Sequence, residues 1–549
     1  MGIRSKLQSS AVLAALNVFA VAAFAVLVMT GARDTGYVFA AAALAAIALR
    51  ARRGYGPTIT AQLLVAAGLL VAYHNVLPRH SVPIAIGGVL LTLLITEQPL
   101  LSDVINRPVI RVANLPGYRP QQSFLVPPTT LYAANVVLIA AVGVFAVASW
   151  PAWPLVALIA VVAAVAAVVG AQALRLRLRG SVTEKQFRTA MERHSPAFAL
   201  YFSAPDHTEY HIEMWRPYLE RLGKPWVVIL REPQPFDTVA ASTTAPVVFC
   251  PLVPQVDDLV TPSMKAVFYV NNGGKNSHMV RFSHLTHIQL LHGDSDKTSS
   301  FNPVTAMFDK IFVAGQAGID RYEAHDVLIP RAKFDIVGRP QVEAINVTHD
   351  HIRTVANPVV LYATTWVGIY TDANYCSLPI GEKIIQGLLD RKVTVVFRPH
   401  PYADRHGPSA RQIARLHQML AEDRDRTGRQ HVFGDVATHQ MSVFDCVNRC
   451  DAMISDVSGV ASDFLYSGKP FALTNMLGET RTTLEASFPL SKAAYVLDKD
   501  AGNMTSTLID LLEEDPLEST RRKVKTYYLG DFDEETYADG FLDAARAYV

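Results

Sequence analysis

The sequence predicts a multi-span α-helical membrane region followed by an α/β region with two parallel-sheet domains. Two patterns lead to this fold class. Residues 9 to about 175 are mostly Ala, Val and Leu with few charges, and they account for much of the 50% hydrophobic content of the chain. From about residue 195, short β-rich runs alternate with helix-length stretches, which is typical of parallel sheets whose strands are joined by crossover helices.

Six apolar segments are candidate transmembrane helices. They cover residues 9–30, 36–49, 60–76, 82–101, 131–149 and 153–173. A span needs about 20 apolar residues, so the segment at 36–49 is short. The sequence therefore predicts a bundle of about six transmembrane helices within residues 1–180.

Basic residues indicate the orientation of this bundle. If the N-terminus is cytoplasmic, the outside loops carry Arg33 and Arg79, whereas the inside segments carry eleven Lys and Arg residues. The inside residues are Arg4, Lys6, Arg50, Arg52, Arg53, Arg107, Arg111, Arg119, Arg175, Arg177 and Arg179. The positive-inside rule predicts this asymmetry, which places residues 180–549 in the cytoplasm. We expect the inside loop at 102–130, which mixes Arg, Pro and aromatic residues, to lie along the lipid headgroups.

Charge and cysteine usage narrow the function classes. The net charge of +1 gives no field that would attract nucleic acid. The spans carry no charge deep within them, which argues against a transporter and favours an anchor that could also present a lipid acceptor. The cysteines, Cys250, Cys376, Cys446 and Cys450, form no CxxC pair or Cys/His ligand set, so we expect buried free thiols in a reducing compartment.

The second half of the chain contains two sets of candidate strands. The first set covers 198–204, 226–230, 247–250, 266–270, 287–293, 310–315 and 334–338, and the second covers 359–365, 394–400, 452–458, 471–475 and 493–497. Each set is long enough for one domain, and the stretch 340–358 is the expected linker. The predicted domains are therefore 195–340 and 358–549, a GT-B-like pair of Rossmann-type domains that face each other across a cleft.

Three polar islands follow strands of this region, at the positions where parallel sheets bind ligands. They are His292-Gly293 with Lys297, the run Arg398-Pro399-His400-Pro401, and the stretch from Ser455-Asp456 to Lys469-Pro470. We expect Gly293 to let the backbone turn and leave the His292 imidazole at the sheet edge, where it would be a good general base. The alternative is an ordinary surface or core histidine, since the chain has 17 histidines.

The other two islands suit an anionic phosphate. Arg398 offers planar forked donors, and His400 could stabilise a developing phosphate charge or protonate a leaving group. A rigid turn with solvated charges is the alternative for this run. Ser458 is expected to cap a helix that begins at Gly459 and extends through Tyr466, and such a helix start favours a diphosphate.

The run Asp294-Ser295-Asp296 leaves a different chemistry open. A DxD pattern after a strand can bind a divalent metal that carries a nucleotide diphosphate, as in GT-A transferases. Such a short pattern recurs by chance, and Asp423-Arg424-Asp425 is another example in this chain. We therefore expect no metal site and no cofactor.

Together these motifs resemble the CDP-glycerol:poly(glycerophosphate) glycerophosphotransferases, the polymerases and primases of wall teichoic acid synthesis. The resemblance rests on the His292-Gly293 pair with Lys297, on the RPHP run at 398–401, and on the SDxSxxxSDF pattern at 455–464 with the following Lys469-Pro470. Weaker matches lie at 337–340 and 362–366. The resemblance covers roughly residues 195–530.

The resemblance implies transfer of glycerol phosphate, or a related polyol phosphate, from a CDP-activated donor to an acceptor hydroxyl, with release of CMP. It implies two catalytic residues, His292, which would deprotonate the acceptor hydroxyl, and His400, which together with Arg398 would hold the donor phosphates. The helix start at Ser458 and Gly459 would cradle the diphosphate. The other substrate-binding residues that it implies are Gly293, Lys297, Thr365, Ser455, Asp456 and Asp463.

The leading interpretation is a multi-pass cell-membrane enzyme with its catalytic region in the cytoplasm. Its partners would be a CDP-polyol donor, a lipid-linked or polymeric cell-wall acceptor and the membrane, with no nucleic acid. One alternative is a GT-B nucleotide-sugar glycosyltransferase of cell-envelope glycan synthesis, which would release UDP or GDP. Another is a catalytically silent membrane scaffold, which would fit Thr364, Val367 and Gly459, where the chain departs from the family pattern.

Overall fold

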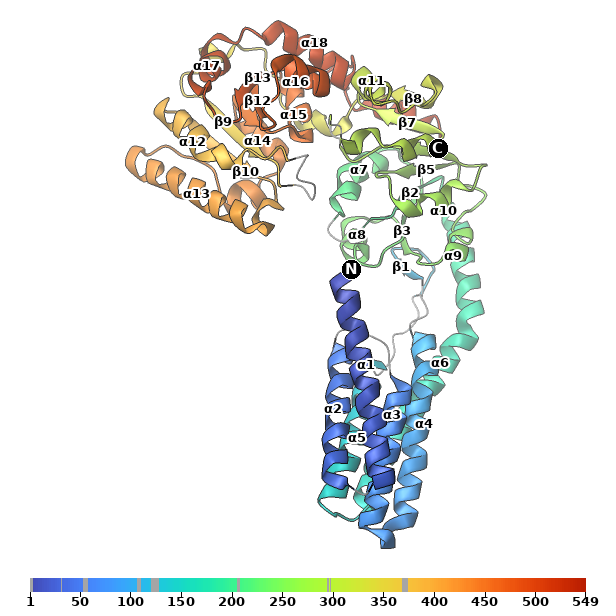
Figure 1. The fold of residues 1–549 in the computed structure, drawn as a ribbon. Helices are drawn as coiled ribbons and strands as arrows, with labels where there is room; N and C mark the ends of the chain where they lie inside the picture. The colour runs from blue at the N-terminus through green and yellow to red at the C-terminus, as the bar shows by residue number, and fades with distance from the viewer. Residues whose placement is uncertain are drawn as a thin grey trace. The chain divides into compact units, whose positions relative to one another are not determined.

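The chain divides into two compact units. The computed structural model describes residues 3–30, 32–52, 58–105, 110–119, 128–204, 208–293, 296, 298–367 and 374–549. The first unit consists of Met1–Val109 and Gly117–Thr189, and the second consists of Ile110–Pro116 and Ala190–Val549. Figure 1 shows the elements of each unit.

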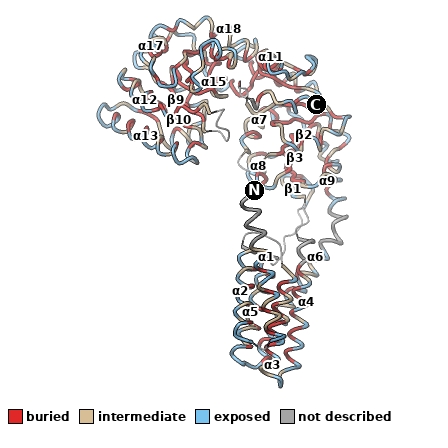
Figure 2. The backbone as a smooth tube through the Cα atoms, viewed as in Figure 1, coloured by how far each residue is buried: buried red, intermediate tan, exposed pale blue. Residues whose placement is uncertain are grey.

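The first unit is a bundle of helices. They are α1 (Ile3–Ala25, continued by a π-helical turn at Val26–Thr30), α2 (Arg33–Arg52), α3 (Ile59–Val76), α4 (Ser81–Ile105), α5 (Pro128–Val147) and α6 (Trp153–His194). Each contributes small or aliphatic side chains to one apolar core, for example Leu16, Ala43, Leu69, Leu91, Val142 and Ile159. Figure 2 shows buried positions alternating with exposed ones along these helices, because many apolar side chains also point outward.

Five helical segments among the described residues are long and apolar enough to cross a membrane. They are Val12–Thr30, Ile59–Val76, Pro78–Gln98, Thr130–Val147 and Trp153–Gln172. The remaining predicted span, 36–49, lies in α2, which is helical over 20 residues but is not one of these five segments. Even so, α2 buries Ala40, Ala43 and Ile47 in the core of the bundle.

The second unit contains two sheets. Within the described residues, the first sheet has eight strands in the order β1-β4-β3-β2-β5-β6-β7-β8, and the second has five in the order β10-β9-β11-β12-β13. The bounds are β1 Arg111–Ala113, β2 Phe198–Phe202, β3 Trp226–Leu230, β4 Val247–Phe249, β5 Ala266–Tyr269, β6 Thr286–Gln289, β7 Lys310–Val313, β8 Phe334–Ile336, β9 Val359–Thr364, β10 Thr394–Pro399, β11 Ala452–Ser455, β12 Phe471–Asn475 and β13 Tyr495–Asp498. All twelve predicted strands are present, so the prediction of an α/β region is confirmed, although β6 and β11 end earlier than expected.

The strand orders identify where each sheet can bind a ligand. Apart from β1, all neighbouring strands are parallel. The order reverses between β2 and β5 in the first sheet and between β9 and β11 in the second. In doubly wound sheets, ligands bind beyond the carboxyl ends of the strands at this reversal.

Helices cover both sheets of the second unit. They are α7 (Tyr210–Glu220), α8 (Phe236–Ser242), α9 (Val253–Asp257), α10 (Ser277–Val280), α11 (Gln316–Ala324), α12 (Gly381–Asp390), α13 (Gly407–Thr427), α14 (Val443–Arg449), α15 (Gly459–Phe464), α16 (Arg481–Ser487), α17 (Met504–Ile509), α18 (Glu518–Leu529) and α19 (Asp539–Arg546). Helices α12 and α13 lie side by side against one face of the second sheet (Figure 1), and α14 and α15 pack on its other face. The last helix, α19, returns to the first sheet, where Phe541 packs 5.1 Å from the ring of Trp215 in α7. The predicted boundaries 195–340 and 358–549 stay predictions.

The prediction that the loop at 102–130 lies along the lipid headgroups is wrong for part of that loop. Its residues Arg111–Ala113 form β1, which extends the first sheet by antiparallel pairing with β4, with Arg111 opposite Phe249. Arg111 also donates to Asp237 at 2.6 Å, and the Asn114 amide donates to two backbone carbonyl oxygens at the end of α8. This segment between α4 and α5 is therefore part of the second unit.

Candidate functional site

A strained turn after β6 brings His292 to the carboxyl edge of the first sheet. Leu291 has φ +55°, a left-handed conformation that is unusual for a bulky residue. The indole N–H of Trp215 donates to the Leu291 carbonyl at 2.6 Å and holds this turn. The left-handed residue of the turn is therefore Leu291 and not Gly293, which has no positive φ, so the prediction that Gly293 makes the turn is wrong. Its predicted role in substrate binding stays a prediction.

The hydrogen bonding of His292 defines its tautomer. Nδ1 lies 3.3 Å from the carbonyl oxygen of Val270, the residue that follows β5 at the strand-order reversal. Because a carbonyl can only accept, Nδ1 carries the hydrogen and Nε2 keeps its lone pair. Burial lowers the pKa of His292, the Val270 contact partly offsets this, and the positive charge of Arg339 lowers it further. His292 is therefore neutral at pH 7, as a general base must be.

A second histidine, His211 in α7, stacks on His292. The two ring centroids are 3.7 Å apart and the rings are inclined by only 5°. Tyr210 packs edge-on against His211 at 4.3 Å. His211 was not among the predicted site residues, although it follows β2, the strand that flanks the reversal in this sheet. Applying the carboxyl-end rule to β2 would have drawn attention to it.

His400 follows β10 in the second sheet. Its backbone N–H donates to the Thr364 carbonyl at 3.0 Å, and its Nδ1 accepts the backbone N–H of Tyr402 at 3.1 Å. Nδ1 is therefore unprotonated, and in the neutral ring Nε2 carries the hydrogen. The Tyr402 ring lies 5.2 Å from that of His400. Burial, and then the electrostatic influence of Tyr402, raise the pKa of Tyr210, the neighbour of His211 in α7.

Asp456 organises the strand-order reversal of the second sheet from inside the protein. It is fully buried, and its carboxylate accepts from Thr365 N at 2.7 Å, from Thr474 Oγ1 at 2.7 Å and from Ser377 N at 3.2 Å. Burial raises the pKa of Asp456 to about 6, and these hydrogen bonds limit the rise. Thr365 and Asp456 therefore fix the shape of the site, because the groups they present are already engaged within the protein.

The loop between β11 and α15 carries the predicted serines. Ser458 occupies the N-cap position, as predicted, but among the described residues its side chain makes no capping hydrogen bond. Its hydroxyl lies 3.5 Å from that of Ser455, which donates to the Asp456 carbonyl at 3.1 Å. The helix that begins at Gly459 ends at Phe464 and continues as a 3₁₀ turn through Ser467, close to the predicted end at Tyr466.

Two charged residues expected at the substrate have partners within the protein. Arg398 donates through Nη1 to the carbonyl oxygens of Ala437 and, at 2.8 Å, Met441. Asp463 forms a bidentate ion pair with Arg339, in which Nη2 lies 3.0 Å from Oδ2 and both side chains are more than nine-tenths buried. Asp463 therefore joins the two parts of the second unit, and the prediction that it contacts substrate directly is not supported by this geometry.

The alternative of a metal site at Asp294 and Asp296 loses Asp296 as a ligand. The Asp296 carboxylate is buried, pairs with Arg321 at 3.0 Å and accepts from Tyr528 at 2.7 Å. Asp294, Ser295 and the predicted substrate-binding Lys297 lie outside the described residues.

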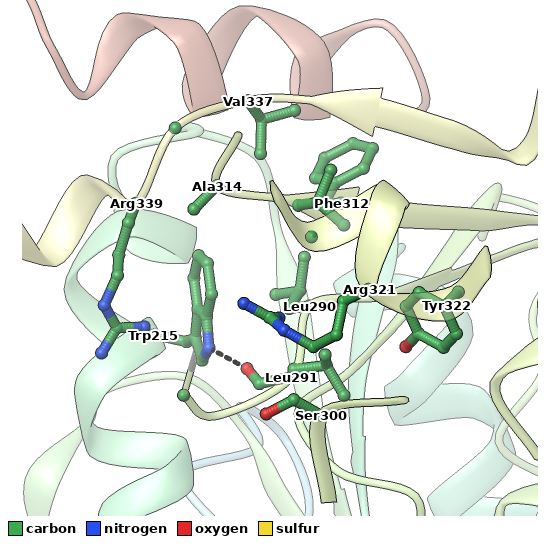
Figure 3. Close-up of a pocket in the computed structure, with 14 residues that line it drawn as sticks. Trp215, Leu290, Leu291, Ser300, Phe312, Ala314, Arg321, Tyr322, Val337 and Arg339 are labelled. Atoms are coloured by element: carbon green, nitrogen blue, oxygen red, sulfur yellow. Dashed lines mark hydrogen bonds between the residues drawn. The ribbon is translucent and has the colours of Figure 1, made fainter. Parts of the chain in front are cut away.

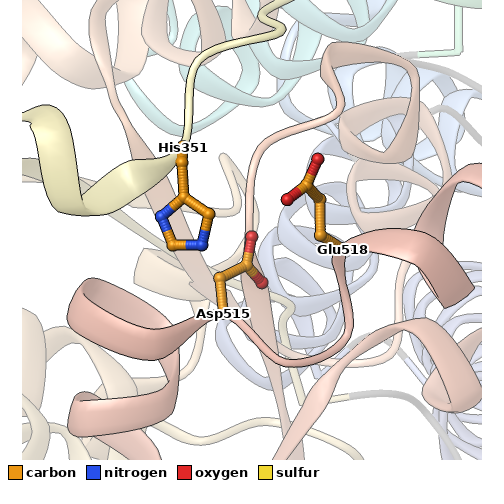
Figure 4. A group of neighbouring side chains, drawn as sticks. All are labelled: His351, Asp515 and Glu518. Carbon is orange, nitrogen blue, oxygen red and sulfur yellow. The ribbon is translucent and has the colours of Figure 1, made fainter.

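A different cluster has the spacing of a metal site. Figure 4 shows His351, Asp515 and Glu518, whose potential ligand atoms lie within 4.8 Å of one another. However, Asp515 is paired with Arg521 at 2.5 Å and accepts from the Tyr495 hydroxyl at 2.8 Å. Its charge is already balanced by a buried guanidinium, so the cluster is explained without an ion.

Two cavities lie at strand ends in the second unit. Figure 3 shows the first, of about 30 Å³, which is lined by Trp215, Leu291, Gly293, Arg321 and Arg339 among others. It is large enough for one or two water molecules but not for a nucleotide. The second, of about 320 Å³, lies beyond β12 and β13 and is lined mainly by polar residues such as Asn475, Asp498 and Thr507.

Comparison with known proteins identifies the family of the segment that contains the second reversal. Residues 322–475, from α11 to the end of β12, match the model of the CDP-Glycerol:Poly(glycerophosphate) glycerophosphotransferase family. This segment contains Thr365, Arg398, His400 and the serine loop of β11. The match confirms the resemblance to this family that was seen in the sequence motifs, and it covers this segment of the chain. No protein of curated function matches the sequence.

Solved structures resemble the chain only remotely. A proposed UDP-N-acetylglucosamine 2-epimerase from Listeria monocytogenes is 10% identical, with 64% of this chain and 96% of that chain covered and a TM-score of 0.45. The wall teichoic acid polymerase TagF is 12% identical (68% and 96% covered, TM-score 0.41), and Anabaena Alr3699/HepE in complex with UDP and glucose is 12% identical (64% and 99% covered, TM-score 0.37). Because these TM-scores lie below 0.5, none of the three defines the fold or the function of this chain.

Proposed function

We propose that the protein is a membrane-anchored transferase that moves glycerol phosphate, or a related polyol phosphate, from a CDP-activated donor to a hydroxyl of a cell-wall or lipid-linked acceptor. The observation that carries the proposal is the family match over residues 322–475, which includes the strand-order reversal of the second sheet. The complementary tautomers of His292 and His400 support it, since one offers a lone pair and the other a hydrogen at Nε2.

In this proposal His292 is the general base. Its Nε2 accepts the proton of the acceptor hydroxyl while the hydroxyl oxygen attacks the donor phosphorus that bears the polyol. A new P–O bond forms, the bond from that phosphorus to the bridging oxygen of the diphosphate breaks, and CMP leaves. A general base contributes about 10²- to 10⁴-fold to such a step.

His400 and the β11–α15 loop form the donor side of the proposed site. His400 would donate from Nε2–H to a donor phosphate, where negative charge builds up on the departing CMP. Ser458 and the backbone of Gly459 would bind the diphosphate. Arg398 would contribute its positive charge to the site without a direct contact, because its Nη1 already donates to carbonyl oxygens of the protein. Protein donors aimed at the phosphates can replace a metal ion in stabilising this charge.

We further propose that the bundle spans the cell membrane six times, with the second unit in the cytoplasm. The five apolar helices and the packing of α2 in the same core support this topology. The pairing of β1 with β4 supports it independently, because the α4–α5 segment must then be on the same side as the second unit. The buried cysteines, which are all free, fit a reducing compartment.

Nucleotide release tests the proposed reaction. The full chain in nanodiscs is mixed with CDP-glycerol, CDP-ribitol or common nucleotide sugars, with a lipid extract as acceptor and with or without EDTA. We expect CMP release from a CDP-polyol that is insensitive to EDTA and falls about 10²- to 10⁴-fold in His292→Ala. The matched control is His439→Ala, since the His439 side chain is 66% exposed and should be dispensable.

Other outcomes would redirect the assignment. Release of UDP or GDP with sugar incorporation would indicate a nucleotide-sugar glycosyltransferase instead. Full activity of His292→Ala would exclude this residue as the base. Nucleotide binding without turnover of any donor would favour a membrane scaffold.

A further inference from the structure

His211 is an unusual residue for its surroundings. The residue is only 6% exposed. Among the described residues, neither of its ring nitrogens has a hydrogen-bond partner. Phe202 packs edge-on against it at 6.1 Å, and Tyr210 does so at 4.3 Å. A buried polar group without a partner costs stability, so a phenylalanine would suit this site better for packing alone.

The contact that His211 makes is with the candidate base. Its ring covers one face of the His292 ring at 3.7 Å, with an angle of 5° between the planes. The other restraint on His292 is the hydrogen bond from Nδ1 to the Val270 carbonyl, which fixes the edge of the ring. One contact thus sets the rotation of the imidazole within its plane, and the other sets the plane itself.

We propose that His211 is a positioning residue, whose flat ring holds the plane of the His292 imidazole and shields one of its faces. In this role it keeps Nε2 of His292 unprotonated and directed at the acceptor hydroxyl. This inference rests on the proposed function and deepens it. His211 takes no part in bond making, because both of its nitrogens lie in the buried ring edge and its face is occupied by His292.

The charges around the pair agree with this role. The titratable and charged groups that act on His292 from the described elements are His211 and Tyr210 in α7 and Arg339 after β8. Burial, and then the proximity of His292, lower the pKa of His211 to about 3, so His211 stays neutral under all physiological conditions. When the pair takes up its first proton, that proton therefore enters on His292.

The test measures His292 directly, without needing turnover. The full chain in nanodiscs is treated with diethyl pyrocarbonate, which modifies neutral imidazole, and modification of His292 is followed by peptide mass spectrometry between pH 5 and 8. In His211→Ala we expect the midpoint of the profile to move up toward the ordinary value of about 6.5 as water reaches the exposed face. His211→Phe, which keeps a flat ring of similar size, should restore the profile of the unaltered protein.

The control is His417, a half-buried histidine whose Nε2 has no hydrogen-bond partner among the described residues. His417 in α13 packs between Phe397 and Phe433, away from His292 in the chain and in another core. His417→Ala should leave the His292 profile unchanged. If His211→Ala does not fold, His211→Leu takes its place, because it fills similar volume without a flat ring.

Turnover provides the second readout. If CMP release is observed, His211→Ala should lower kcat by about 10- to 100-fold, as expected for a misoriented base, and should move the acid limb of the kcat/KM profile to higher pH. An unchanged His292 profile in His211→Ala would overturn the proposal, and so would a failure of His211→Phe to restore it, since the nitrogens and not the ring would then matter. Absence of CMP release from the unaltered protein would count against the proposed function, whereas the modification profile would still decide the role of His211.

Discussion

Breaking the buried ion pair between Arg339 and Asp463 should destabilise the second unit far more than breaking an exposed pair. The two side chains are only 8% and 9% exposed and share two N–H···O contacts. Replacing one partner by Ala leaves the other charged group buried without compensation, which costs about 3–5 kcal/mol. Replacing both removes both charges, so we expect the double variant to lose less than the sum, with a coupling free energy of about 2–3 kcal/mol.

The assay is a double-mutant cycle on the full chain in nanodiscs. The free energy of unfolding is measured by urea titration with tryptophan fluorescence, since Trp215 lines the same cavity as Arg339. The matched control is Arg415 with Glu382, a pair of 3.3 Å whose side chains are 46% and 60% exposed, for which we expect a coupling below about 1 kcal/mol. A coupling for the buried pair no larger than that of the control would refute the view that this contact fastens the two parts of the second unit.

Three further perturbations follow from the same geometry. Asp456→Asn places an amide donor among three donors, so it should cost about 2–4 kcal/mol in urea unfolding. The pKa of Asp456 rises from 3.8 to about 6 on folding, so its contribution to the free energy of unfolding falls as the pH rises from about 4 to about 6. The difference in free energy of unfolding between the unaltered protein and Asp456→Asn, which does not titrate, should therefore be larger at pH 5 than at pH 7.5. Lys469→Met removes two hydrogen bonds, of 2.6 and 2.9 Å, to carbonyl oxygens at the end of α14, and should cost about 2–4 kcal/mol with an unchanged urea m-value. Arg111→Ala breaks an ion pair whose partner Asp237 is 80% exposed, so we expect the free energy of unfolding to fall by less than about 1 kcal/mol. A larger loss would contradict a minor role for this contact.

The sequence predicted most of the second unit because its strands are buried on both faces. Such strands are near-continuous apolar runs, as in Trp226–Leu230, and they are recognised without knowledge of their partners. β1 could not be recognised in this way, since it has three residues, Arg111–Ala113, and exists only because β4 is available to pair with it. A short strand that depends on a distant partner carries little local signal.

The candidate site shows the same division between local and distant information. His292 and His400 were predicted because each follows a recognisable strand. The partners of Asp456 were not, because Ser377 and Thr474 come from distant parts of the chain and meet only in the folded sheet. His211 was missed because the carboxyl-end rule was not applied to β2, and because its place in the first turn of α7 shows nothing of the His292 ring on which it stacks.

The origin of β1 has a consequence for any attempt to isolate the second unit. A shortened chain that begins at Ala190, after the helical bundle, would lack the strand that covers the edge of β4. The backbone groups of Val247–Phe249, now buried, would become an open and apolar edge, which is a common cause of self-association between sheets. We expect such a chain to aggregate, and a peptide with the sequence of residues 110–116, or its fusion ahead of Ala190, to restore solubility by filling the vacant place.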